Sequence, residues 1–334
     1  MNTARQDLGT LHFNETLAIS RSTQRTIALI LSTFTKKLRF RMIKSFWMLL
    51  ASLLFAMMAA FARMGASDFS SLELVFYRSL FGVVVIWAWV AYQGQTVKTP
   101  LMRAHLMRSF LGTFALTIWF YAIARLPLGT AMTLNYTSPL YMALIVIVLA
   151  IRHGETFNRA SAAAVVLGFL GVTLVLKPEL QPGQMAPALI GLTSGFFAAL
   201  AYFQVRELTR MNEPEWRIVF YFTLFGTVWG LLGHLCLTGS MTPVTLDNVP
   251  ALIGMAVTAT GAQLAMTRAW GSDNTLLTAV FQYSAIVFAA CFGAWFFDEP
   301  IGLLSAIGIA LIMIAGVWAA LMSRKKRALV HMYG

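Results

Sequence analysis

The sequence predicts an all-α integral membrane protein whose ten transmembrane helices form two inverted five-helix repeats. Composition is the first observation behind this fold class: of 334 residues, 58% are hydrophobic and only 11% are charged. Soluble domains average about 25% charged residues, so a soluble fold is not expected. The second observation is a set of apolar runs of the length that a bilayer core requires, about 20 helical residues. The third is a group of motifs that recurs in both halves of the chain.

The predicted spans follow one another with short polar connections. None of them alternates between polar and apolar residues with period two, as the strands of a membrane barrel would, so we expect helices. In chain order the predicted spans are Phe46–Gly65, Leu74–Tyr92, His105–Ile123, Leu128–Ile151, Ala160–Leu176, Ala188–Val205, Ile218–Leu237, Val249–Ala269, Thr275–Phe297 and Ile301–Met322.

The positions of the basic residues predict the orientation of these spans. The chain carries 25 Lys and Arg against 13 Asp and Glu, a formal net charge of +12. When the N-terminus is placed in the cytoplasm, the only basic residues that fall elsewhere are Arg63, Arg78, Arg125 and Lys177, and Arg108 is counted as cytoplasmic. Cytoplasmic loops carry the excess of Lys and Arg, so both termini should be cytoplasmic. The charge therefore reports orientation in a lipid bilayer, and we expect no nucleic acid partner.

The chain is expected to divide into two repeats with flanking segments. Residues 1–41 are polar and read as a disordered cytoplasmic extension, and whether they belong to the native protein stays open. Residues 42–178 and 188–323 hold five spans each, and residues 324–334 form a basic cytoplasmic tail. Glu155 and Glu299 lie 144 residues apart, and the apolar blocks around them superpose at nearly this offset. Tandem repeats with an odd number of spans cross the membrane in opposite senses, which predicts an inverted repeat.

Short motifs along the chain carry a family resemblance. They are Phe76-Tyr77-Arg78, Arg108, Phe120-Tyr121-Ala122, Leu126-Pro127-Leu128, Tyr136-Thr137-Ser138-Pro139, Gly154-Glu155 and Asp298-Glu299-Pro300. Over about residues 43 to 323 they resemble the EamA family of the drug/metabolite transporter superfamily. One departure is the ninth span, where family members often carry a proline and this chain has Gln282-Tyr283-Ser284. The resemblance implies the ten-helix fold, a bacterial inner membrane and coupling to protons or another gradient.

Candidate substrate-binding residues are the polar side chains inside the spans. Arg78 can hold a carboxylate or phosphate through its fork-shaped guanidinium, and a charge inside a bilayer is costly and usually functional. The alternatives that the sequence leaves open are a structural ion pair with Glu73 or Asp68 and snorkelling of the Arg78 side chain to the outer surface. Polar positions of both halves near mid-depth complete the predicted pocket. They are Asn135, Tyr136, Ser138, Tyr202, Gln204, Gln263, Gln282 and Tyr283.

Three further features of the spans shape the predicted pocket. Pro139 lacks a backbone donor and is expected to bend the fourth span, so that Asn135 faces a cavity. Trp119 and Tyr121 are candidate aromatic lining residues, with helix packing as the alternative. Gly226 and Gly230, four residues apart on the seventh span, predict a close approach of a neighbouring helix.

The motifs of common enzymes are missing from the sequence. No lysine follows a glycine, and neither a His-Glu-x-x-His motif nor a metal-spaced cysteine pair occurs, so we expect no nucleotide, metal or other cofactor. The favoured function is a secondary-active transporter that moves a small metabolite, an amino acid or related carboxylate compound, by alternating access, with export as the expected direction. The alternatives are an exporter of hydrophobic or cationic drugs and a non-transporting membrane protein. A homodimer stays open.

Overall fold

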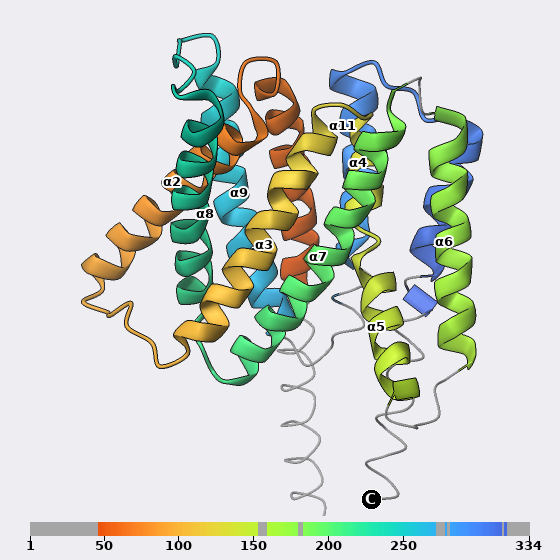
Figure 1. Cartoon of the computed structure of the whole chain (residues 1–334), viewed down its shortest axis with the longest axis horizontal. Coiled ribbons are helices and arrows are strands. Elements are labelled where there is room, and N and C mark those ends of the chain that lie inside the picture. Colours follow the sequence, from red (N-terminus) through yellow and green to blue (C-terminus); the bar gives the residue numbers. More distant parts are fainter. Residues whose placement is uncertain are drawn as a thin grey trace, which may run out of the picture. The chain divides into compact units, whose positions relative to one another are not determined.

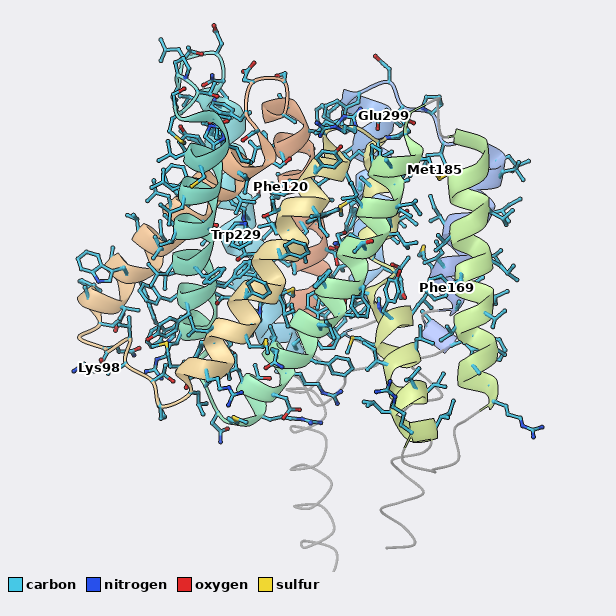
Figure 2. All side chains as sticks on the ribbon, viewed as in Figure 1. Lys98, Phe120, Phe169, Met185, Trp229 and Glu299 are labelled. Carbon is cyan, nitrogen blue, oxygen red and sulfur yellow. The ribbon has the colours of Figure 1, made fainter. Side chains whose placement is uncertain are left out.

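The structure is a computed structural model that describes residues 46–152, 159–179, 183–271, 278, 281–315 and 317–318. Over these ranges the chain is helical and holds no strand. The expected extension 1–41, the tail 324–334 and Glu155 lie outside the described residues. The described helices run between two ends, with Lys98 at one and Glu299 at the other (Figures 1 and 2).

Seven segments are long and apolar enough to cross a membrane, which is the pattern of a multi-pass membrane protein. They match the predicted spans one to four and six to eight. Within the other three predicted spans lie the shorter apolar helices Ala162–Val172, Ser284–Phe296 and Leu303–Ala315. The helices are Phe46–Gly65, α2 (Ser71–Tyr92), α3 (Met102–Ile123), α4 (Leu128–Asn135), α5 (Ser138–Arg152), α6 (Arg159–Glu179), α7 (Met185–Arg210), α8 (Glu215–Thr238), α9 (Val249–Trp270), α11 (Ser284–Phe296) and Leu303–Ala315.

A capping box sets the start of α2 three residues before the predicted start. Ser70 Oγ accepts a hydrogen bond from the backbone N–H of Glu73 (3.2 Å), and the Glu73 carboxylate accepts one from the Ser70 N–H (2.9 Å). This reciprocal pair satisfies two N–H groups near the helix start that would otherwise lack partners. At 1.5 Å per residue, the earlier start puts Arg78 roughly 10 Å along α2 from its first residue.

The predicted fourth span is not one continuous helix. It is interrupted at Tyr136 and Thr137, because α4 ends at Asn135 and α5 begins at Ser138. Pro139 is the second residue of α5 and has no N–H to donate to the Asn135 carbonyl one turn earlier. The freed carbonyl faces Gly195 of α7, where an added Cβ would lie only 3.0 Å from it. A glycine on α7 thus leaves room for the broken backbone.

The predicted ninth span is also interrupted, at Tyr283, although it contains no proline. Residues 281 and 282 are helical, Tyr283 is a turn residue and α11 begins at Ser284. Ser52 Oγ lies 3.0 Å from the carbonyl oxygen of Phe281 and 3.3 Å from that of Gln282, so a hydroxyl of the first helix serves the backbone at the break. The two breaks meet where Gln282 Nε2 lies 3.5 Å from Ser138 Oγ.

Two buried contacts between a histidine and a glutamate hold the ends of α8. His234 Nε2 of α8 lies 3.2 Å from Glu73 Oε1 of α2, and Thr242 donates its backbone N–H to the same oxygen (2.7 Å). At the opposite end, Glu213 Oε1, two residues before α8, lies 2.8 Å from His105 Nε2 of α3. The ends of α8 are therefore tied to α2 at one side and to α3 at the other.

A close contact joins α8 to α2 along their length. An added Cβ at Gly230 of α8 would lie 2.7 Å from both the Leu72 carbonyl oxygen and the Phe76 nitrogen, which are backbone atoms of α2. Real Cβ atoms do not approach backbone so closely, and small residues are what permit such approach in membrane bundles. The expectation of a close helix approach at Gly230 is thus met by α2.

We expect Gly230→Ala to destabilise the protein by about 1–3 kcal/mol, because α2 must move to admit the methyl group. The measurement is thermal unfolding of the purified protein in detergent. Gly129→Ala is the matched control, since its Cβ would meet Ala290 at an ordinary 3.5 Å. Equal losses in the two variants would contradict the close contact.

Glu213 also makes the stability of the folded protein depend on pH. Burial raises its pKa, but hydrogen bonds with the side chains of Thr99, His105 and Arg217 outweigh burial and hold the pKa below its usual range. A carboxyl group whose folded pKa is lowered stabilises the protein above the pKa of the unfolded chain, about 4.3 for Glu. That stabilisation is lost as the pH falls through the folded pKa.

We therefore expect Glu213→Gln to lower the unfolding temperature at pH 7, and the difference from the unsubstituted protein to shrink as the pH falls below about 4. Unfolding in detergent between neutral and acidic pH measures it. Glu207→Gln, at an exposed ion pair with Arg210, is the control and should change little. A difference that stays constant with pH would rule out this role of the carboxylate.

Candidate functional site

A small cavity lies among seven helices and is lined by two buried arginines. It has a volume of about 50 Å³ and is lined from the helix Phe46–Gly65 and from α2, α3, α4, α7, α8 and α9. Most of the lining is apolar or aromatic. Its charged and polar side chains are Arg78, Arg108, Asn135, Tyr202 and Gln263. We call this space the central cavity.

Two arginines in the central cavity share one aromatic ring. Arg78 of α2 is 2% exposed and Arg108 of α3 is 3% exposed. The guanidinium carbon of Arg108 lies 4.2 Å from the centroid of the Phe222 ring of α8, and that of Arg78 lies 5.4 Å from it. An aromatic face attracts cations, so Phe222 lowers the cost of holding both charges away from water.

A glycine makes room for the Arg108 guanidinium. Gly112 lies one turn after Arg108 on α3, and an added Cβ there would overlap Arg108 Nη1 and lie 3.1 Å from the Phe222 ring. The Arg108 side chain therefore folds along its own helix into the space beside Gly112. Any larger residue at position 112 would push the guanidinium out of this position.

No described carboxylate lies within ion-pair distance of Arg78 or Arg108. Glu73, the partner that the sequence offered as an alternative for Arg78, is engaged by His234 and by two backbone N–H groups. Asp68 is exposed in the loop before α2. The structural ion pair considered for Arg78 is therefore not formed, and the two cations face the cavity without a counter-charge among the described residues.

The unsatisfied polar atoms around the cavity are nitrogens. Buried and without a hydrogen-bond partner are Nε of Arg78, Nε and Nη1 of Arg108, and Nε2 of Gln263. A buried donor without a partner costs free energy, and in native structures such groups call for an explanation such as a functional role. Four unpaired nitrogen donors around one cavity suit a ligand with hydrogen-bond acceptors, and the two positive charges suit an anion.

The predicted site residues divide into three groups. Arg78, Trp119, Asn135, Tyr202 and Gln263 line the central cavity together. The remaining polar positions do not line it: Tyr136, Ser138, Gln282 and Tyr283 lie at or beside the two helix breaks, and Gln204 is half-buried on α7. The third group is Tyr121, which lines a different cavity.

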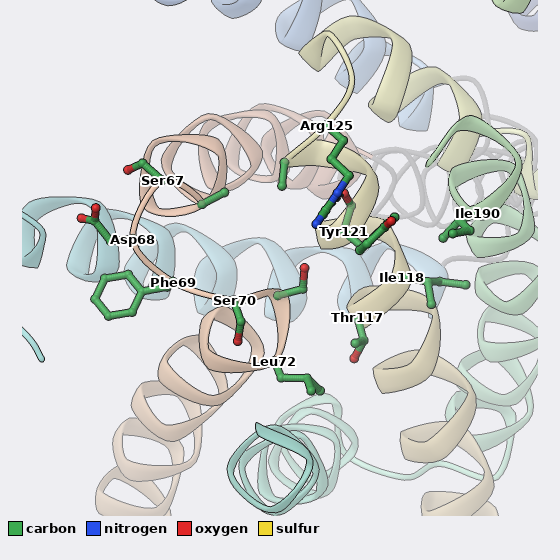
Figure 3. Close-up of a pocket in the computed structure, with 13 residues that line it drawn as sticks. Ser67, Asp68, Phe69, Ser70, Leu72, Thr117, Ile118, Tyr121, Arg125 and Ile190 are labelled. Carbon is green, nitrogen blue, oxygen red and sulfur yellow. Dashed lines mark hydrogen bonds between the residues drawn. The ribbon is translucent and has the colours of Figure 1, made fainter. Parts of the chain in front are cut away.

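This second cavity, the outer cavity, has a volume of about 770 Å³. It lies between the loop Ala66–Ser70 with the first residues of α2, the last turns of α3 and Ile190 of α7 (Figure 3). The guanidinium carbon of Arg125 lies 3.8 Å from the Tyr121 ring centroid on its wall. Leu116 of the central cavity and Thr117 of the outer cavity are neighbours on α3, so one helix lines both spaces.

The sequence analysis missed Arg108 as a site residue. The charge pattern counted it with the cytoplasmic residues, but the structure buries it in the central cavity. The signal that could have found it is its position four residues inside the predicted third span, with Gly112 one turn later. Phe222 could not be found in this way, because it is one of 25 phenylalanines in a chain rich in apolar residues.

We expect removal of either buried charge to stabilise the protein, because a desolvated cation without a partner opposes folding. Arg108→Met and Arg78→Met should each raise the free energy of unfolding by about 1–3 kcal/mol, as apolar replacements of buried charges often do. Thermal unfolding in detergent measures the effect. Arg210→Met, at an exposed ion pair, is the control and should stay within about 0.5 kcal/mol. Loss of stability in both cavity variants would contradict the uncompensated charge.

Comparison with known proteins bears on both fold and family. The model of the EamA-like transporter family matches residues 42–177. The pseudopaline exporter of Pseudomonas aeruginosa (strain UCBPP-PA14) is 30% identical over 266 residues, which cover 80% of this chain and 92% of the exporter. A riboflavin transporter of Vibrio cholerae is 27% identical over 290 residues, 84% of this chain and 95% of that protein.

Two more distant similarities agree with these. An S-adenosylmethionine uptake transporter of Rickettsia bellii is 24% identical over 230 residues, 69% of this chain and 76% of that protein. A protein of known crystal structure superposes with a TM-score of 0.60 at 20% identity, over 86% of this chain and 98% of that one, which supports the fold alone. The length and identity of the match to the pseudopaline exporter, together with the family model, make this chain a member of the EamA-like transporter family of the drug/metabolite transporter superfamily.

Proposed function

We propose that this chain is a secondary-active transporter of the inner membrane that exports an amino acid or a related carboxylate compound by alternating access. Its relatives are named as transporters of small metabolites, some as exporters and some as uptake transporters. Family membership therefore supports the transport of a small metabolite. The substrate class is taken from the positive charge of the site, and export is kept as the direction expected from the sequence, with both termini cytoplasmic.

A reciprocal contact between α2 and α8 supports the inverted repeat on which the proposed mechanism depends. An added Cβ at Gly226 would lie 3.1 Å from Ser79 Cβ, and one at Gly82 would lie 2.7 Å from Thr223 Cγ2. Ser79 and Thr223 are 144 residues apart, as are Gly82 and Gly226, and this is also the separation of Ser138 and Gln282. Equivalent residues that exchange contacts in this way are the sign of a two-fold axis.

The two helices of this contact run antiparallel. The start of α8 adjoins the residues after α2, since Arg217 Nη2 donates to the Thr96 carbonyl (2.9 Å), and its end adjoins the start of α2 through His234 and Glu73. A two-fold axis that relates antiparallel helices lies perpendicular to them, in the plane of the membrane. This supports ten spans in two inverted repeats, residues 42–178 and 188–323. In the proposal, residues 1–41 and 324–334 flank these repeats in the cytoplasm.

The substrate site lies, in this proposal, where the repeats meet. Transporters with inverted repeats bind substrate near mid-membrane beside interrupted helices, whose free backbone groups line the site. The two breaks meet each other at Ser138 and Gln282, and Asn135 at the end of α4 lines the central cavity. Arg78 contacts Phe222, the residue 144 positions later. Arg78 binds the substrate carboxylate, while Asn135, Tyr202 and Gln263 contact the rest of the substrate from α4, α7 and α9.

The size of the central cavity favours a mechanism with moving repeats. A cavity of about 50 Å³ holds no metabolite, because small-molecule pockets measure about 300–1,000 Å³. The helices around it must separate to admit a substrate, and the outer cavity of about 770 Å³, which α3 also lines, is the proposed exit. Two buried arginines also disfavour the export of cationic drugs, because like charges repel.

Counterflow in liposomes tests this function. The reconstituted protein is preloaded with pooled unlabelled amino acids, nucleosides or organic acids and given the labelled pools. We expect labelled carboxylate compounds to accumulate, and Arg78→Lys to weaken uptake by about tenfold or more, because lysine keeps the charge but loses the two-pronged hydrogen bond. Asn135→Ala should reduce uptake as well.

Arg210→Ala, on the protein surface, is the matched control and should transport as the unsubstituted protein does. Retained transport by Arg78→Ala would assign Arg78 a structural role. If folded protein accumulates none of the pools, the proposed carboxylate transport is wrong.

A further inference from the structure

The cavity arginines lie close enough to act on one ligand. Both guanidinium carbons lie within 5.4 Å of the Phe222 ring centroid. They are therefore at most about 10 Å apart, a distance over which charges in a dry interior are hardly screened. They also approach from different helices, Arg78 from α2 and Arg108 from α3.

The charge balance of the cavity decides what that ligand must be. The two guanidinium groups repel each other, and the described residues offer no carboxylate to offset them. A substrate with one negative charge would leave one buried cation uncompensated in the loaded cavity. A substrate with two negative charges would neutralise both, so the loaded cavity would carry no net charge through the bilayer.

We propose that the central cavity binds its substrate as a dianion, which presents two negative charges to Arg78 and Arg108 together. This names the substrate class of the proposed transport site and rests on that function. Dicarboxylates and phosphate monoesters share the required chemistry, since each offers several acceptor oxygens with a total charge of −2. Guanidinium groups bind both kinds of oxyanion through paired N–H donors.

The other residues that line the central cavity indicate which carbon skeleton such a dianion could have. The side chains of Phe55, Leu116 and Met266 offer few hydrogen-bonding groups, so once the helices have separated they suit an apolar carbon skeleton between the charged ends. Gln263 supplies one more unpaired nitrogen donor beside the arginines. Asn135 is less available, because its Nδ2 already donates to Ser194 Oγ (2.9 Å).

A pair of probes of equal size tests the charge requirement without any variant. Succinate carries two carboxylates, whereas succinamate has an amide in place of one of them. The thermal unfolding of the purified full-length chain in detergent is titrated with each at pH 7.5 and constant ionic strength. We expect succinate to bind about tenfold or more tightly than succinamate, because one charge-assisted hydrogen-bonding group is lost in succinamate. Equal binding of the two probes, or binding of neither together with no response to phosphate, overturns the proposal.

Variants of each arginine test whether both positive charges contribute to the preference for a dianion. In Arg78→Gln and in Arg108→Gln one positive charge remains, so the preference for succinate over succinamate should fall to about twofold or less. Arg108→Lys keeps the charge and should keep the preference, and Arg210→Gln is the surface control. A preference that survives in both glutamine variants would show that the arginines do not act as a pair.

Inorganic phosphate, largely doubly charged at pH 7.5, distinguishes the two sources of the dianion. Stabilisation by phosphate but not by succinate assigns the site to phosphate compounds, and the reverse assigns it to dicarboxylates. Because these measurements report binding, they separate the two proposals. A dianion preference without counterflow would refute transport alone, and counterflow of compounds with one negative charge would refute the dianion alone.

Discussion

The uncompensated charge of Arg78 and Arg108 is the constraint around which the described structure is arranged. A cation in a bilayer-spanning segment costs at least about 2.5 kcal/mol at mid-depth on insertion scales, and two neighbouring cations cost more because they repel. The structure offsets part of this cost with the Phe222 ring and with the space beside Gly112. It does not remove the cost with a carboxylate, although Glu73 lies on the same helix as Arg78. A binding site that must accept an anion has to keep its cations free of internal partners.

The carboxylates at the described helix ends do not pair with Arg78 or Arg108 but connect neighbouring helices. Glu73 and Glu213 tie the two ends of α8 to α2 and α3, and Glu299 accepts the backbone N–H of Leu128 (2.7 Å) at the start of α4 while pairing with Arg63. A negative charge at a helix N-terminus is stabilised by the helix dipole. Acidic groups at the helix ends and basic groups in the interior thus perform separate tasks. The carboxylates at the ends hold the helices together, and the interior arginines have no carboxylate partner among the described residues.

The helix bundle combines close helix packing with two interrupted helices. Gly230 brings α8 against the backbone of α2, and such close-packed contacts are expected to transmit strain between helices. The two helix breaks at Asn135–Ser138 and at Tyr283 lack part of their helical hydrogen bonds and are joined by one long contact of 3.5 Å. Segments with few internal hydrogen bonds open at low free-energy cost. Rigid pairs of helices that move about broken ones are a physical basis for exposing the central cavity to each side in turn.

The amino-acid sequence by itself determined the membrane class, the approximate spans and the break near Pro139, because bilayer thickness sets span length and proline removes a local donor. Tertiary structure decided what depends on distant partners. The break at Tyr283 involves a hydroxyl of Ser52, 230 residues away from the Gln282 carbonyl it contacts, and no local pattern announces it. Arg108 reads as a cytoplasmic charge until the fold brings Phe222 over it, since a charge pattern records order along the chain and not burial. Site geometry is a property of packing, which sequence periodicity does not encode.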